Sequence, residues 1–328
     1  MTTLDTGALC YAERPWRRAP DDMALNGDIY RTGAGERAQV VQTALEAGIT
    51  LFHAAHEREA VSLGQSLRTL GVRERIVLST TEGDALSRCP DTEAGACEAV
   101  SRAIVRKLEL LGTDRIDVFH LYDVRADVHT PARLAGALRA LSAARDAGHV
   151  TRFGATCSGD YDCLASAIER REYVPDCVVA RFNFLDQGAI TRLLPVCGEH
   201  GIVALAAQTF AWLGGVPFVR FPNTWRLRNM TRSFTGQSAA QAHLRWALGQ
   251  ANVGGVLVSM QDAAQVKENK EAVQSAMPRA DMASVFGAFV EAIRGTEDGW
   301  RALLEDPEWE VRAAAEAYLE ASERSCKE

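Results

Sequence analysis

Short apolar runs alternate with longer amphipathic stretches along most of the chain. Runs such as "ITLFHA" and "RIVLSTT" are rich in β-branched residues and end in polar ones, which is typical of buried strands. The stretches between them repeat apolar residues at helical spacing. We therefore expect strands at 49–54, 75–81, 115–122, 150–156, 176–184, 201–208 and 253–260, with a first strand near 27–32. Helices are expected between these strands, one ending near 70 and others covering about 93–111, 131–147, 160–170, 187–200, 238–250 and 262–273.

This order of elements predicts a parallel sheet, because strands that are joined through helices run in the same direction. Seven or eight strand–helix units within about 250 residues fit an α/β fold of the closed (β/α)8 TIM barrel type better than an open sheet. No G-x-G-x-x-G follows an early strand, so the dinucleotide-binding fingerprint of the open doubly wound fold is missing. Catalytic groups of such barrels lie at the carboxyl ends of the strands. Those ends carry His53, Thr81, Tyr122, Thr156, Asn183, Gln208 and Ser259.

The last part of the chain continues beyond the repeating units. The segment "EDPEWEVRAAAEAYLEAS" begins with Asp306 as a cap and Pro307 at the first helical position, and its apolar residues follow helical spacing. We expect one domain over 1–328, with the barrel at about 27–275 and appended helices at about 280–328. These helices are expected to pack on the barrel or on a partner subunit, as in a homo-oligomer.

The composition is that of an ordinary globular protein and narrows the choice of partners. The formal net charge of −7 argues against nucleic acid, because neutralising phosphates requires a basic face. The apolar runs are too short to span a membrane, and "MTTLDTGALCYAERPWRR" holds no apolar segment of a secretory signal. None of the eight cysteines forms a C-x-x-C pair, which favours free thiols in a cytoplasmic protein over disulfides or zinc. The expected partner is a small-molecule substrate.

Several segments, in order from about Ala34 to Val273, resemble the motifs of one family. "ALEAGITLFHAA" is similar to A-x-x-x-G-I-x-x-F-D-T-A, and "KLELLGTDRIDVFHLYD" to S-L-x-x-L-G-x-D-Y-I-D-L-Y-x-x-H-x-x-D. "AGHVTRFGATC" resembles x-G-K-V-R-x-I-G-V-S-N, and "QVKEN" resembles Q-x-x-E-N. These are motifs of the aldo-keto reductases, NADPH-dependent (β/α)8 barrels. The resemblance implies that fold and a site at the carboxyl ends of the strands.

The resemblance also implies a catalytic tetrad of Asp, Tyr, Lys and His, and this chain departs from it at every position. The aspartate falls on His53, and the lysine falls on Thr81. The histidine falls on Tyr122, while Arg58 or Glu59 stands where the tyrosine is expected. Threonine cannot supply the positive charge that lowers the pKa of a tyrosine. The family mechanism therefore cannot be transferred to this chain residue by residue.

The positions that the resemblance assigns to the nicotinamide cofactor are altered as well. The Ser–Asn pair that holds the carboxamide reads Thr156 and Cys157, and the aromatic residue that stacks on the nicotinamide falls on Ala207. The basic residue for the 2′-phosphate falls near Asp262, which would repel it. The residues kept on the adenine side are Gln265, Glu268 and Asn269, and with Thr156 they form the remaining candidate cofactor site. The expected cofactor is therefore either none or NADP(H).

New titratable groups at the predicted barrel mouth suggest a rebuilt acid–base set. His120 precedes Tyr122 by two residues and therefore faces the same side of its strand, one layer deeper. His53, His120 and Tyr122 are expected to form one hydrogen-bonded cluster, with Glu82 or Glu57 nearby. In this set Tyr122 is the acid, and a histidine is the base near neutral pH. The alternative is a polar plug that fills a catalytically dead site.

The two histidines of "HAAHE" also raise the question of a metal, because histidine and carboxylate groups bind zinc and iron. Such a site would combine His53, His56 and His120 with a carboxylate. A loop rather than a helix is expected after His53, and no second spaced motif supports the site. We therefore expect no metal.

A long loop after the strand at 201–208 is aromatic and basic in an otherwise acidic protein. Barrel loops of this length usually cover an active site. We expect a lid that contacts a large, flat or anionic substrate, or a pyrophosphate, and the alternative is a subunit interface. The candidate contact residues are Phe210, Trp212, Trp225 and Arg226.

Three functions follow from these patterns. The first is an enzyme that uses proton transfer without redox chemistry, for a dehydration, an isomerisation or a cyclisation. The second is an NAD(P)H-dependent oxidoreductase with a rearranged site. The third is a catalytically inactive barrel that serves as a binding or regulatory subunit.

Overall fold

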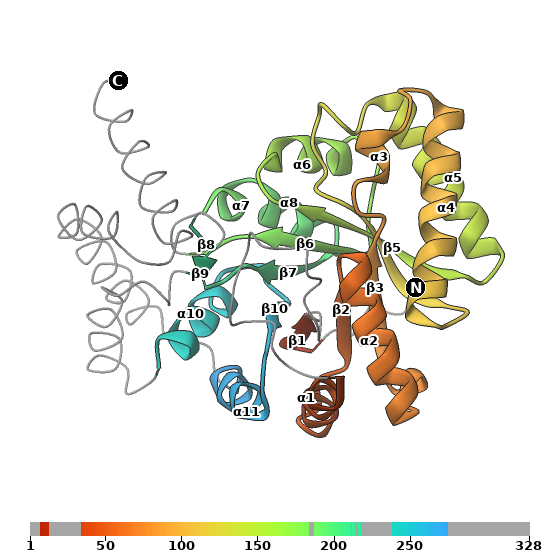
Figure 1. Cartoon of the computed structure of the whole chain (residues 1–328). Coiled ribbons are helices and arrows are strands. Elements are labelled where there is room, and N and C mark those ends of the chain that lie inside the picture. The colour runs from red at the N-terminus through yellow and green to blue at the C-terminus, as the bar shows by residue number, and fades with distance from the viewer. Residues whose placement is uncertain are drawn as a thin grey trace, which may run out of the picture.

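Eight parallel strands form a closed barrel in the computed structural model, which describes residues 7–12, 34–183, 187–210, 212–213, 216–217 and 238–274. Around the barrel the strands follow the order β1-β10-β7-β6-β5-β4-β3-β2 (Figure 1). Their bounds are β1 Leu9–Ala12, β2 Leu51–Ala54, β3 Val77–Thr81, β4 Ile116–Leu121, β5 Val150–Cys157, β6 Cys177–Arg181, β7 Val203–Ala207 and β10 Gly255–Ser259. The predicted α/β barrel is confirmed.

The first strand of the barrel is not where the sequence predicted it. Leu9–Ala12 forms β1 and pairs with both β10 and β2, whereas 27–32 lies outside the described residues. Cys10 and Tyr11 are fully buried in this strand. The barrel therefore starts earlier than residue 27. Four residues followed by the charged segment "ERPWRR" are too short for an alternating pattern to be recognised.

The helices surround the barrel and largely match the predicted ranges. One predicted helix, 187–200, is divided at Arg192 into two, because Pro195 lacks the N–H that a continuous helix would need and fits a first turn instead. The appended helices expected at 280–328 lie outside the described residues. The helices are α1 Ala34–Glu46, α2 Glu57–Leu70, α3 Ala85–Arg88, α4 Glu93–Leu111, α5 Pro131–Asp146, α6 Tyr161–Glu169, α7 Gly188–Thr191, α8 Leu193–Glu199, α10 Ala239–Leu248 and α11 Ala263–Ala272, and the short segments are η1 Arg73–Arg75, β8 Trp212–Leu213 and β9 Val216–Pro217.

Local sequence signals set the ends of the helices that frame the site. Thr92 caps α4, since its hydroxyl oxygen accepts the N–H of Gly95 at 3.1 Å. Thr130 caps α5, and Pro131 occupies the first helical position. Gly112 ends α4 with φ +64, a left-handed conformation that favours glycine. The caps at Thr92 and Thr130 fix where two loops leave the barrel mouth, and Gly112 fixes the turn into β4 on the opposite face.

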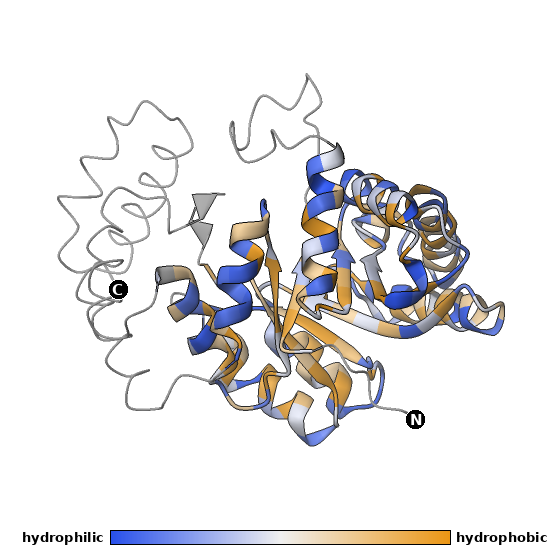
Figure 2. Ribbon diagram, turned by 90° about the horizontal axis from the view of Figure 1, so that it is seen from below, coloured by the Kyte–Doolittle hydropathy of each residue, from blue (hydrophilic) through white to orange (hydrophobic). Residues whose placement is uncertain are grey.

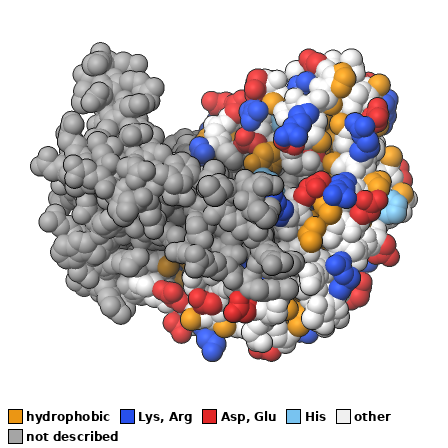
Figure 3. Space-filling view, viewed as in Figure 1, with side chains coloured by type: hydrophobic (Ala, Val, Ile, Leu, Met, Phe, Trp, Pro, Cys, Tyr) orange, Lys and Arg blue, Asp and Glu red, His pale blue; other side chains and the backbone are white. Residues whose placement is uncertain are grey.

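The core has two layers, which Figure 2 displays as apolar strands inside helices whose outer faces are polar. One layer lies between the strands and the helices, and a smaller one fills the barrel interior with Cys10, Leu51, Val118, Cys177, Val179, Leu205 and Leu257. The outside carries acidic and basic side chains interspersed over the described surface (Figure 3). Within the part of the chain that the structure describes, none of the helices combines the length and apolar character needed to cross a bilayer.

Candidate functional site

A buried chain of three side chains links the ends of three neighbouring strands. His53 of β2, Ser79 of β3 and His120 of β4 are at most 5% exposed. The Nδ1 of His53 lies 2.8 Å from the Ser79 hydroxyl oxygen, which lies 2.8 Å from Nε2 of His120. His120 Nδ1 lies 3.4 Å from the carbonyl oxygen of Ala155 on β5. This series of hydrogen bonds therefore runs from His53 at the mouth to the backbone of β5 in the barrel wall.

The end of this chain determines the position of each proton. The Ala155 carbonyl can only accept, so Nδ1 of His120 carries a hydrogen and Nε2 carries a lone pair. The Ser79 hydroxyl then donates to His120 and accepts from Nδ1 of His53. Nε2 of His53 is left with a lone pair and has no hydrogen bond among the described residues. His53 therefore presents an unprotonated Nε2 that can accept a proton.

Burial keeps both imidazoles neutral. It lowers the pKa of His120 to about 4, and the pKa of His53 lies well below its usual value because of burial and the nearby charges of His120, Lys107 and His56. Sequence alone does not reveal how completely water is removed from the two rings, so these lowered pKa values could not be predicted from it.

Tyr122 and Glu82 lie at the rim, and neither belongs to the histidine chain. The half-buried ring of Tyr122 faces the His56 ring, with centroids 6.1 Å apart at 68°. Glu82 accepts a 2.7 Å hydrogen bond from the backbone N–H of Tyr122. Burial raises the pKa of Glu82 to about 8, so this carboxyl is neutral at pH 7. The expected single cluster is thus two groups, a buried chain and a rim.

Glu57, the other carboxylate expected near the cluster, points elsewhere. Its two oxygens accept hydrogen bonds of 3.3 Å from Arg106 at the protein surface. Ser79 and Lys107, which no sequence motif indicated, take part instead. Ser79 could have been found, because it precedes Thr81 by two residues and so shares its face of β3. Lys107 carries no such signal, because it reaches the site from α4.

The candidate cofactor residues are largely engaged with the protein itself. The hydroxyl oxygen of Thr156 accepts the N–H of Asp123 at 2.7 Å, and burial raises the pKa of the neighbouring Cys157 thiol to about 12. The Asp262 carboxylate caps α11 by accepting the N–H of Gln265 at 2.8 Å. A 2′-phosphate at this helix end would meet a carboxylate instead of a cation.

The adenine-side residues are likewise held within the fold. The side-chain oxygen of Gln265 accepts the N–H of Gln261 at 2.9 Å. The carbonyl of Glu268 accepts a hydrogen bond from Gln241, and Asn269 is only 3% exposed. Contacts within the fold are therefore enough to explain why these residues are present, without a bound adenine.

The predicted lid lies mostly outside the described residues. Phe210 is half-buried and faces the ring of His243, with centroids 6.3 Å apart. Trp212 belongs to β8, which pairs with β9 as a short antiparallel hairpin. Trp225 and Arg226 lie outside the described residues, so the lid stays a prediction. In the described ranges, no group of three or more His, Cys, Asp or Glu side chains is arranged to hold a metal.

A family model for the aldo/keto reductase family matches residues 23–216, more than half of the chain. The chain belongs to the aldo/keto reductase family. A D-threo-aldose 1-dehydrogenase of a Pseudomonas species is 28% identical over 212 residues, covering 56% of this chain and 63% of that relative. An NADH-specific methylglyoxal reductase of Escherichia coli (strain K12) is 27% identical over 199 residues, covering 55% of this chain and 57% of the relative. The chain thus spans less than two thirds of either curated relative.

A solved structure agrees with this aldo/keto reductase fold. The holo form of an aldo-keto reductase from Bacillus halodurans is similar with a TM-score of 0.64 at 18% sequence identity. The similarity covers 87% of this chain and 94% of the other. At this level of identity the comparison establishes the fold and nothing finer.

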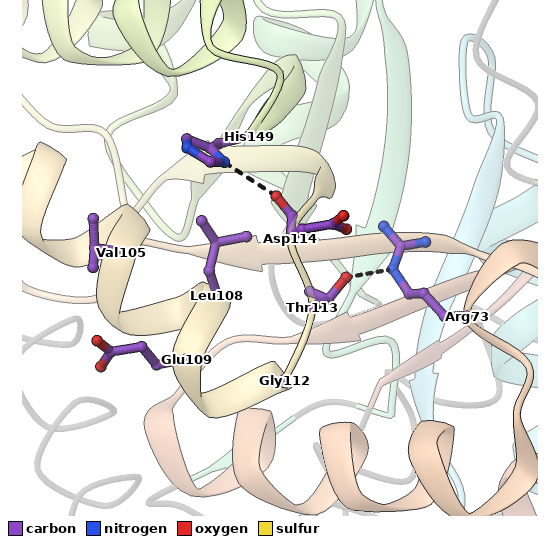
Figure 4. Close-up of a pocket in the computed structure, with 8 residues that line it drawn as sticks. All are labelled: Arg73, Val105, Leu108, Glu109, Gly112, Thr113, Asp114 and His149. Atoms are coloured by element: carbon purple, nitrogen blue, oxygen red, sulfur yellow. Dashed lines mark hydrogen bonds between the residues drawn. The ribbon is translucent and has the colours of Figure 1, made fainter.

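A surface pocket lies on the barrel face opposite the mouth. It is lined by Arg73, Thr113, Asp114 and His149, which precede strands β3, β4 and β5, and by residues of α4 (Figure 4). The guanidinium of Arg73 donates to the Thr113 hydroxyl and forms an ion pair with Asp117 at 3.0 Å. The amino-terminal face of such barrels contributes stability rather than catalysis. The pocket is therefore separate from the candidate active site.

Proposed function

We propose that the chain is an enzyme that transfers protons on a small carbonyl or hydroxy compound at the barrel mouth, without redox chemistry. The observation that carries the proposal is the series of hydrogen bonds from Ala155 through His120 and Ser79 to His53. It leaves the Nε2 lone pair of His53 without a partner among the described residues. Dehydration, isomerisation and cyclisation all need a base and an acid at one carbonyl compound. His53 and Tyr122 are the groups proposed for these two roles.

His53 is the proposed base. Its Nε2 takes a proton from the carbon beside a carbonyl, and the C–H electron pair moves into an enol system. The imidazolium can share its new charge along the chain, because Nδ1–H of His53 faces Ser79, whose own proton faces His120. The lowered pKa of His53 favours rapid return of that proton to the product.

Tyr122 is the proposed acid. Burial and the nearby carboxylates raise the pKa of its phenol, so it holds its proton at neutral pH. The phenol O–H donates to the carbonyl oxygen as the enol forms, and the phenolate takes the proton back when the enol reverts. Protons and electrons balance without an oxidant or a reductant. No step passes through a nicotinamide, since Thr156, Cys157 and Asp262 do not fit the carboxamide and the 2′-phosphate.

Proton exchange in heavy water tests this proposal without knowledge of the natural substrate. Aldoses, hydroxyketones and 2-oxoaldehydes are incubated with the protein in D2O, and loss of the C–H signal beside the carbonyl is followed by proton NMR. We expect exchange with at least one probe, lowered about 100-fold or more in His53→Gln and in Tyr122→Phe. His149→Gln, on the opposite barrel face, is the matched control and should exchange at the normal rate. Equal rates in all four proteins would refute the assignment.

A second candidate function is an oxidoreductase that uses NADH. The two curated relatives are named as a dehydrogenase and as an NADH-specific reductase. A carboxylate such as Asp262 repels a 2′-phosphate but accepts a hydrogen bond from a ribose hydroxyl, which favours NADH over NADPH.

Cofactor titration separates the two candidate functions. Under the proton-transfer proposal, NADH and NADPH up to millimolar concentration leave the fluorescence and the melting temperature unchanged. Saturable binding of NADH that is at least tenfold tighter than that of NADPH, and that reverses in Asp262→Arg, would replace our first proposal with the second.

A further inference from the structure

The turn between β2 and α2 is held by side chains from three different elements. The carbonyl oxygen of Ala55 accepts hydrogen bonds from the Lys107 ammonium of α4 at 2.7 Å and from the Thr81 hydroxyl of β3 at 2.9 Å. The backbone N–H groups of Ala55 and His56 both donate to the Glu59 carboxylate, at 2.9 Å and 3.1 Å. Both the donor side and the acceptor side of this turn are therefore fixed.

Lys107 is an unusual residue for this task. It is only 4% exposed, and lysine is almost never fully buried unless it is paired. Its burial lowers the pKa of the ammonium to about 8, while the nearby carboxylates of Glu59 and Glu57 act in the opposite direction. A neutral side chain of the same length would fill the space at lower cost. The ammonium therefore has a role that packing alone does not explain.

A second buried ionisable residue holds the opposite side of the rim. Glu82 is 6% exposed and accepts the N–H of Tyr122, just as Lys107 donates to the residue before His56. The rings of His56 and Tyr122 then face each other at 6.1 Å. The backbone beside His56 is thus held by Lys107, and the backbone of Tyr122 is held by Glu82, and both side chains are buried and ionisable.

We propose that Lys107 and Glu82 are positioning residues that set the mutual orientation of His56 and Tyr122 at the mouth. The inference rests on the proposed function only in assigning the acid to Tyr122. Lys107 acts through the Ala55 carbonyl, and Glu82 acts through the Tyr122 N–H. Neither needs to touch the substrate. Glu82, selected from the sequence as catalytic, becomes a neutral anchor of the acid.

The orientation of the two rings can be measured directly. In the full-length protein, specifically labelled histidine and tyrosine give a nuclear Overhauser effect between the His56 and Tyr122 rings. We expect Lys107→Met to abolish this signal while far-UV circular dichroism stays native, and Lys107→Arg to restore at least half of it. Lys267→Met, which removes an exposed lysine of α11, is the matched control and should leave the signal unchanged.

Glu82 supplies an independent pair of variants. Glu82→Gln keeps a neutral acceptor for the Tyr122 N–H and should preserve the signal at pH 7, whereas Glu82→Leu should abolish it. If the methionine and leucine variants do not fold, loss of the signal in Glu82→Gln or in Lys107→Arg still overturns the proposal. An unchanged signal in folded Lys107→Met also overturns it.

The D2O assay keeps this inference separate from the proposed function. Loss of the ring signal in Lys107→Met with undiminished proton exchange would support the positioning role and remove Tyr122 from the chemistry. Loss of the ring signal together with a fall in kcat at nearly constant KM would support both. A wild-type protein that shows the ring signal but no exchange would overturn the function alone.

Discussion

Replacing Gly154 by alanine is expected to lower the free energy of unfolding by about 2–5 kcal/mol and to break the buried histidine chain. A Cβ at this position of β5 would lie 2.2 Å from Nδ1 and 2.5 Å from Cε1 of His120. The imidazole cannot move away without losing Ser79 at 2.8 Å and the Ala155 carbonyl at 3.4 Å. Overpacking and the loss of buried hydrogen bonds therefore both lower the free energy of unfolding of this variant. Urea denaturation at pH 7 measures the loss.

Gly35→Ala is the matched control for this substitution. A Cβ at Gly35, in the first turn of α1, meets no atom within 4 Å. Its alanine variant should be as stable as the parent or slightly more so, because glycine is the weaker helix former. A Gly154→Ala variant as stable as Gly35→Ala would mean that His120 is not held where we describe it.

Stability is also expected to fall steeply as the pH drops from 6.5 towards 4. Burial lowers the pKa of His120, His129 and His243 to about 4 each, so the unfolded chain binds more protons than the folded one in this window. Each histidine contributes roughly 3 kcal/mol of stability that is complete above pH 6.5 and lost near pH 4. Glu82 acts in the other direction, because its raised pKa of about 8 favours the folded state more as the pH falls from 8 to 4.5.

The two effects together predict a stability maximum near pH 7, where the slope from the three histidines cancels the slope from Glu82. Urea denaturation between pH 4.5 and pH 8.5 would locate it. His129→Gln should reduce the loss of unfolding free energy between pH 6.5 and pH 4.5 by about one third, because one of the three histidines is removed. His149→Gln, which changes an exposed histidine, should leave this loss unchanged. A profile that stays flat from pH 7 to pH 4.5 would show that these rings are not buried in the neutral form.

Most of the barrel could be predicted because its pattern is local. Seven strands lie within a few residues of their expected places, since each has an apolar run bounded by turn or helix signals. The Leu9–Ala12 strand was missed, because four residues carry too little pattern and are defined by pairing with Val256 and Phe52, far along the chain. This segment forms a strand because of its tertiary contacts rather than because of its local β propensity.

The candidate site was only partly predictable, for a related reason. Alternation along strands placed His53 and His120 on the interior correctly, but the linking hydroxyl of Ser79 depends on the register between β2, β3 and β4. The role of Lys107 depends on how α4 packs over the β2–α2 turn. Degree of burial, which is the largest cause of the pKa shifts of His53, His120 and Glu82, is likewise a property of the whole fold.

The histidine chain also constrains which substitutions this mouth can accept one at a time. The single Ser79 hydrogen can satisfy one acceptor, and it is already directed to His120. An aspartate in place of His53 would bring a second acceptor to the same oxygen, and one of the two would be left without a proton. Residues 53, 79 and 120, together with the glycine at 154 that makes room for the ring, are therefore energetically coupled. The effect on stability of changing two of them together should differ from the sum of the two single effects.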